Sequence, residues 1–206
     1  ISPMKSETAM FPVWLRAWHW ANALLFLTLV GTGFALHYGE AGAGRFFRWA
    51  VIGHNIAGVA CTLAYGFYLG AMIVRGHWRQ YLPLRPFFQR AVRQVRYYLS
   101  DIFQGGHHPF PATLQNRFNP LQQLSYIGAI FLMFPLQIIT GLLLLFPATV
   151  PEKIGELPGL LPVAIGHSVT AYVFTMFLIV HVYLALTVSE PHTGIRAMLR
   201  GDRKPS

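Results

Sequence analysis

The chain has 206 residues, of which 54% are hydrophobic and only 11% are charged, and its formal net charge is +9. This composition excludes an ordinary soluble domain. The single cysteine, Cys61, lies within an apolar stretch, so the chain alone provides neither a disulfide framework nor an iron–sulfur cluster.

Four apolar stretches are long enough to cross a bilayer as helices, which takes about 20 residues each. They run over residues 15–36, 46–74, 121–146 and 161–188. The first begins among Trp14, Trp18 and Trp20, which suit a membrane interface, and we expect it to be a retained span and not a cleaved signal peptide. The sequence therefore predicts an all-α integral membrane four-helix bundle, forming one transmembrane domain over residues 1–206.

The distribution of lysine and arginine predicts the orientation, because basic residues are retained on the cytoplasmic side. Of the 16 such residues, all but Arg45, Arg48 and Lys153 lie in the two tails, at the very start of the first stretch (Arg16) or between the second and third stretches. Both termini are therefore predicted to be cytoplasmic. The positive charge then reflects topology and contact with anionic membrane lipids, and nucleic-acid binding is not expected.

The basic connection before the third stretch contains a periodic segment, Arg85 to Leu99, whose apolar residues alternate with arginines. This pattern predicts an amphipathic helix on the cytoplasmic surface, although an ordinary solvated basic face remains an alternative. Further along, Asn119 followed by Pro120 is typical of a helix start, with the asparagine as N-cap.

Histidines lie inside three of the four stretches: His19 in the first, His54 in the second, and His167 and His181 in the fourth. With both termini inside, His19 and His181 share the inner depth. His54 and His167 share the outer depth. On one helix the 14 residues from His167 to His181 span about 21 Å and return to within about 40° of the same face. These positions leave room for two haems, one above the other.

Two axial imidazoles on a haem iron leave no position for oxygen or substrate, so the expected chemistry is electron transfer alone. Glycines in the stretches would let helices approach a flat macrocycle, although small residues also serve plain helix packing. They are Gly31, Gly33, Gly58, Gly128, Gly141 and Gly166.

A lone histidine in a membrane helix is often only hydrogen-bonded to a neighbour, and for any one of the four this alternative stays open. His37 lies 18 residues beyond His19, on nearly the same face, and competes with His54 as the outer ligand. The histidines outside the stretches fit interfacial or surface roles, and no function is assigned to them: His77, His107, His108 and His192.

The chain resembles the dihaem cytochrome b subunits of membrane-bound formate dehydrogenases, with relatives in nickel–iron hydrogenases and thiosulfate reductases. The likeness covers all four stretches in order. It rests on Arg16-Ala17-Trp18-His19-Trp20, Gly53-His54, Gly166-His167 and His181-Val182-Tyr183. The resemblance implies an outer b haem held by His54 and His167. It implies an inner one held by His19 and His181.

The resemblance also implies a quinone pocket beside the inner haem, using an asparagine just before the third helix, and Asn119 matches that position. Arg16 and Arg196 are weaker candidates for haem propionates or a quinone. We expect an electron-transfer subunit of the bacterial inner membrane linking quinone, either menaquinone or ubiquinone, to an outer-side iron–sulfur or c-type cytochrome subunit. The catalytic metal centre would belong to another subunit. The alternative is a membrane anchor without haem or a proton-relay or transport subunit.

Overall fold

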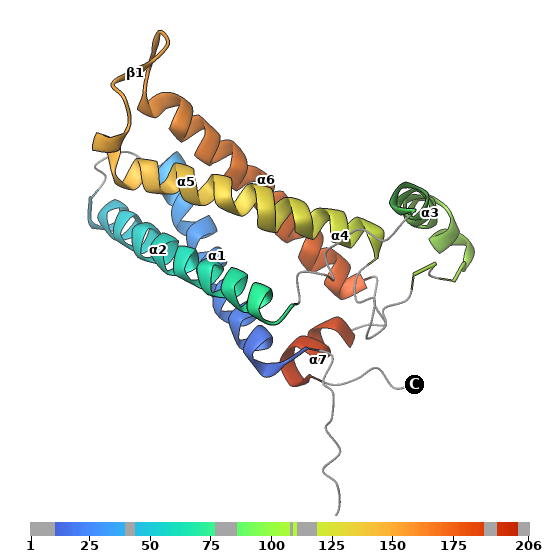
Figure 1. Ribbon diagram of the computed structural model, residues 1–206. Coiled ribbons are helices and arrows are strands. Elements are labelled where there is room, and N and C mark those ends of the chain that lie inside the picture. Colours follow the sequence, from blue (N-terminus) through green and yellow to red (C-terminus); the bar gives the residue numbers. More distant parts are fainter. Residues whose placement is uncertain are drawn as a thin grey trace, which may run out of the picture. The chain divides into compact units, whose positions relative to one another are not determined.

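The computed structural model describes residues 11–39, 44–76, 86–107, 109–110, 119–187 and 193–201 (Figure 1). Within these ranges four helices are long and apolar enough to cross a membrane: Val13–Tyr38, Gly44–Val74, Pro120–Leu145 and Leu160–Leu186. The predicted membrane helical bundle is confirmed, and its helix bounds lie within a few residues of those expected from hydropathy.

The helices carry the labels of Figure 1. The first two spans are α1 (Val13–Tyr38) and α2 (Gly44–Val74), and the fourth is α6 (Leu160–Thr187). The third contains α4 (Pro120–Ile127), a π-helical segment (Gly128–Met133) and α5 (Phe134–Leu145). The shorter elements are α3 (Phe87–Leu99), α7 (Thr193–Arg200) and two 3₁₀ turns, Asp101–Gln104 and Pro147–Thr149.

A small β-hairpin, which is not among the elements predicted from the sequence, lies between α5 and α6. Strand β1 (Lys153–Ile154) pairs antiparallel with β2 (Leu157–Pro158). Its turn begins at Gly155, whose φ of +62° is readily adopted only without a side chain. The hairpin is exposed along both strands and contacts the start of α6 through β2.

Contacts divide the chain into two compact units, residues 1–66 with 140–206, and residues 67–139. The first unit contains α1, most of α2, the second half of α5, α6, the hairpin and α7. Its buried positions hold small side chains such as Ala50 and Ala57, while large apolar side chains such as Leu24, Leu63 and Met176 are exposed. This distribution suits helices whose backbones approach closely and whose outer surface meets lipid.

The second unit is organised by the packing of α3 against α4. Side chains of both helices are buried there, including the polar Gln94, Asn119 and Gln123. The π-helical segment follows α4 directly and ends two residues before Pro135. Because proline has no backbone N–H, it cannot complete the regular helical ladder, which accounts for a local change of hydrogen-bond register.

Candidate functional site

The first of two histidine pairs in the larger unit joins α1 to α6. The ring centroids of His19 and His181 lie 6.3 Å apart, with 50° between the ring planes. Aromatic side chains flank both rings. Trp20 meets His19 edge-on at 5.2 Å, and Phe177, one turn before His181, stacks on it at 6.0 Å. Each ring of the pair is thus in contact with an aromatic side chain of its own helix.

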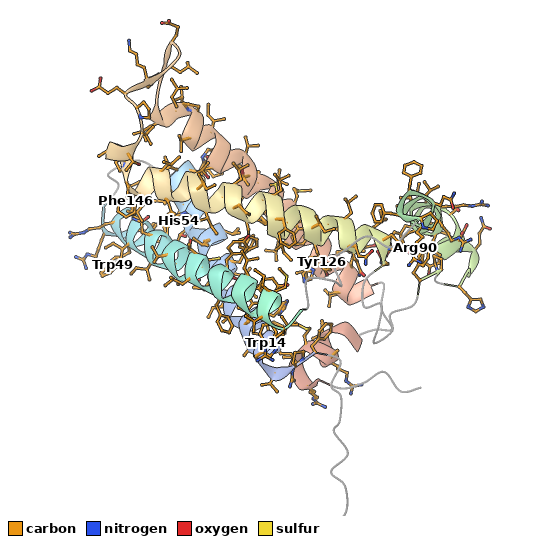
Figure 2. The ribbon with its side chains drawn as sticks, in the orientation of Figure 1. Trp14, Trp49, His54, Arg90, Tyr126 and Phe146 are labelled. Carbon is orange, nitrogen blue, oxygen red and sulfur yellow. The ribbon has the colours of Figure 1, made fainter. Side chains whose placement is uncertain are left out.

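The second pair joins α2 to the same α6. The centroids of His54 and His167 also lie 6.3 Å apart, with 75° between the ring planes. Figure 2 shows His54 towards the end of α2 that carries Trp49, with Phe146, which directly follows the third span, at the same end. The residues expected at equal depth in the sequence are thus the ones that face each other in the structure.

The equal ring separations fit one metal ion between each pair. A bond from a metal ion to an imidazole nitrogen is about 2 Å long, which places two rings on one ion about 6 Å apart between centroids. Among the described residues, no three histidine, cysteine, aspartate or glutamate side chains gather into a cluster for a bare metal ion. Two opposed imidazoles with nothing else ligating match the axial ligation of a haem iron.

Threonine hydroxyls hold both rings of the second pair by their Nδ1 atoms. Thr32 Oγ1 on α1 lies 2.9 Å from Nδ1 of His54, and Thr140 Oγ1 on α5 lies 3.0 Å from Nδ1 of His167. With Nδ1 occupied in this way, Nε2 is the nitrogen left to bind a metal ion.

The residue after each threonine is a glycine that makes room for the same ring. A Cβ atom at Gly33 would lie 3.4 Å from Cε1 of His54, and one at Gly141 would lie 3.2 Å from Cε1 of His167. Both distances are at or below the usual closest approach of a Cβ atom, so a larger side chain would push against the imidazole. From the sequence, these glycines were expected to let helices approach a flat macrocycle or to serve plain helix packing, and the threonines are not among the predicted site residues.

His37, the competing ligand, is not brought to either pair. Its ring packs edge-on against Tyr38 at 4.8 Å and against Tyr172 at 5.8 Å, and the two tyrosine hydroxyls are hydrogen-bonded at 2.7 Å. His107 lies on the surface. His77, His108 and His192 lie outside the described residues.

Arg16 and Trp20, on either side of His19, contact the short helix α7. The Arg16 guanidinium donates to the carbonyl oxygen of Leu199 over 2.9 Å, and the Trp20 indole N–H donates to that of Met198 over 3.1 Å. Arg16 therefore caps a helix end beside the first pair. Arg196, also on α7, is exposed.

In the smaller unit, Asn119 begins α4 as predicted, with Pro120 at the first helical position. Its Oδ1 accepts from the backbone N–H of Gln122 over 2.9 Å, and its Nδ2 donates to the Tyr98 hydroxyl over 3.2 Å. Asn119 is only 5% exposed, whereas Tyr98 is half-buried. Burial raises the pKa of the Tyr98 phenol, and the hydrogen bond from Asn119 opposes that shift.

Comparison with known proteins identifies the family of the chain. The family model described as prokaryotic cytochrome b561 matches residues 10–201. The chain belongs to this family. It is also 38% identical over 192 residues to "Putative cytochrome YdhU" of Escherichia coli (strain K12), covering 91% of this chain and 71% of that protein. The protein is accordingly a multi-pass bacterial membrane cytochrome of the b type, a class that binds b haem and transfers electrons across the membrane.

Proposed function

We propose that the protein carries two b haems, one between His19 and His181 and one between His54 and His167, and links an outer-side redox partner to the quinone pool of the inner membrane. The observation that carries this proposal is the identical 6.3 Å separation of the two ring pairs. The shared helix α6 would hold the two sites about 21 Å apart along its axis.

The chain's own residues would determine what the sites can do. Bound haem supplies one-electron transfer, and occupation of both axial positions by imidazole leaves no site for oxygen or substrate. Aromatic side chains at the first pair and threonines and glycines at the second fix the ring orientations. The apolar outer surface of the helices would keep the path of electron transfer between the two haems within the membrane.

The redox partner would dock at the end of the larger unit where the second histidine pair lies. The connection there, residues 146–159, is exposed except at Val150 and Gly159, and its regular structure is a 3₁₀ turn and the two-residue strands of the hairpin. Because this connection is short, a partner could approach His54 and His167 closely. We propose an iron–sulfur or c-type cytochrome subunit as the partner, on the outer face set by the distribution of basic residues.

Quinone would react on the opposite, cytoplasmic side, where its conversion to quinol takes up two electrons and two protons. Asn119 is our candidate there, together with Tyr98. Because Asn119 is buried and its amide group is already hydrogen-bonded at both ends, it would act by fixing the Tyr98 hydroxyl, which is the more accessible group. Arg16 and Arg196 remain the candidates for haem propionates.

The test is haem stoichiometry in the purified full-length protein and in four single variants. We expect two haems per chain in the unmodified protein and one haem in each of His19→Ala, His54→Ala, His167→Ala and His181→Ala. Difference spectra should be alike within a pair and distinct between pairs. The surface variant His107→Ala is the matched control and should keep both haems. A chain that binds fewer than two haems, or variants that lose haem in any other grouping, would overturn the proposal.

A further inference from the structure

We infer that Thr32 and Thr140 are positioning residues that fix the tautomer and the ring orientation of His54 and His167. They would thereby lower the midpoint potential of the haem bound between the two histidines. This inference rests on the proposed function, since it requires a haem at the second pair. Neither threonine is among the site residues predicted from the sequence. The hydrogen bonding and the clearance around the two imidazoles carry the inference.

The hydrogen bonds of Thr32 decide which nitrogen of His54 carries the proton. The Thr32 hydroxyl donates its single hydrogen to the backbone carbonyl of Thr28 over 2.6 Å. Towards His54 the hydroxyl oxygen can then only accept, so Nδ1 must be the N–H donor. A neutral imidazole with its proton on Nδ1 presents an unprotonated Nε2, the form that binds iron.

The other ring of the pair is flanked by a corresponding threonine and glycine on a different helical hairpin. Thr140 is 8% exposed and holds Nδ1 of His167 at 3.0 Å. The glycine before each histidine lets the threonine approach: a Cβ atom at Gly53 would lie 3.7 Å from Cγ2 of Thr32, and one at Gly166 would lie 3.8 Å from Cγ2 of Thr140. A Thr-Gly pair on one helix thus faces a Gly-His pair on the next, once between α1 and α2 and once between α5 and α6.

The first pair lacks this support at one of its rings. Nδ1 of His19 is buried and has no hydrogen-bond partner among the described residues. A hydrogen bond accepted from Nδ1–H makes an imidazole a stronger electron donor, which favours the ferric over the ferrous state. Each tenfold increase in the equilibrium preference for the ferric state lowers a one-electron midpoint potential by about 59 mV. We therefore expect the two threonines to lower the midpoint potential of the haem at the second pair.

The experiment is a potentiometric titration of the purified full-length protein carrying Thr32→Val or Thr140→Val, which preserve side-chain shape and remove the hydroxyl. Thr28→Val and Thr175→Val are matched controls, because these hydroxyls bond only to carbonyls of their own helices in the described structure. Thr32→Ser and Thr140→Ser restore the hydroxyl. Low-temperature EPR of the ferric protein provides a second measurement of ligand orientation and strength.

We expect each valine variant to raise the midpoint potential of one haem and to leave the other unchanged, with the serine variants close to the unmodified protein. Loss of that haem in the valine variant but not in the serine variant would equally support the inference. Two retained haems with unshifted potentials and EPR signals would overturn it and leave the proposed function standing. Loss of haem in both valine and serine variants would also overturn it, because the side chain would then serve packing alone. An unmodified chain with fewer than two haems would instead contradict the proposed function.

Discussion

Arg16 of α1 donates a hydrogen bond to the backbone carbonyl of Leu199, in the last turn of α7, over 2.9 Å. The carbonyls at the end of a helix have no partner within the helix. In α7 three of the last four are satisfied: that of Leu199 by Arg16, that of Met198 by Trp20 and that of Ala197 by the backbone N–H of Gly201. An isolated helix of eight residues has little stability of its own. The contacts from Arg16 and Trp20 therefore stabilise α7 against α1, beside His19.

The first prediction concerns this cap. Arg16→Gln should release α7, because it removes both a charge at the negative end of the helix and a hydrogen bond, together about 1 kcal/mol for an exposed group. Hydrogen exchange of the α7 amides should accelerate about fivefold. The control is Arg196→Gln on exposed α7 surface, which should leave exchange unchanged. If Arg16→Gln left exchange unchanged but reduced haem content, Arg16 would instead bind a haem propionate.

The second prediction concerns clearance at the second histidine pair. Gly33→Val and Gly141→Val should displace the imidazoles of His54 and His167, because even a Cβ atom would lie 3.4 Å and 3.2 Å from the respective Cε1 atoms. We expect loss of one haem per chain, measured as haem-to-protein ratio. Gly31→Val is the matched control on α1, since nothing lies within 4 Å of a Cβ atom there. Equal haem content in Gly31→Val and Gly33→Val would contradict this account.

The third prediction concerns the competing histidine. His37→Phe should retain both haems, because the His37 ring already packs between Tyr38 and Tyr172, and phenylalanine can make the same edge-on contacts. The absorption spectrum and the haem-to-protein ratio provide the measurement. A variant that lost a haem while His54→Ala kept two would move the outer ligand from His54 to His37.

Local sequence pattern predicts some of these features and not others. The four spans and the depths of their histidines follow from hydropathy and helical rise, which depend only on neighbours in the chain. The pairing of Thr32 with His54, and the capping of α7 by Arg16, depend on which helices adjoin and how each is rotated. Hydropathy does not fix that rotation. A usable signal was nevertheless present, because Thr-Gly precedes Gly-His in both hairpins.

The fourth prediction separates the two roles of Asn119. Asn119→Leu should lose the N-cap at a cost of about 1 kcal/mol. Asn119→Ser should retain the cap but lose the amide donor to Tyr98, and Tyr98→Phe removes the same contact from the other side. We expect Asn119→Ser and Tyr98→Phe each to slow quinol-dependent haem reduction about fivefold, as for the loss of one hydrogen bond of about 1 kcal/mol. Both haem spectra should be unchanged.

The double variant completes this test. If Asn119 acts through Tyr98, the effects of Asn119→Ser and Tyr98→Phe should be strongly non-additive. Additive effects would mean that Asn119 meets quinone directly, and unchanged rates in both single variants would remove this cluster from the quinone site.

The fifth prediction concerns the outer face of α3. One side of the helix packs on α4 through Gln94 and Tyr97, but a second stripe is fully apolar and uncovered: Phe88, Val92, Val95 and Leu99. These residues recur every three or four positions and so share one face of the helix. Arg93 and Arg96 are exposed beside them. An uncovered apolar stripe bordered by arginines suits the boundary between acyl chains and anionic head groups.

We therefore expect α3 to lie in the interface with this stripe in the lipid. Replacing Cys61 by alanine removes the single thiol of the chain, after which a spin label can be attached at Val95→Cys or at Gln89→Cys. Gln89 is exposed but lies about 120° from Val95 around the helix. In nanodiscs containing anionic lipid, the label at 95 should be accessible to oxygen and protected from a water-soluble nickel chelate, and the label at 89 should show the reverse. Equal accessibility to the nickel chelate at both positions would place α3 in water, because only burial of one face in the bilayer distinguishes the two sites.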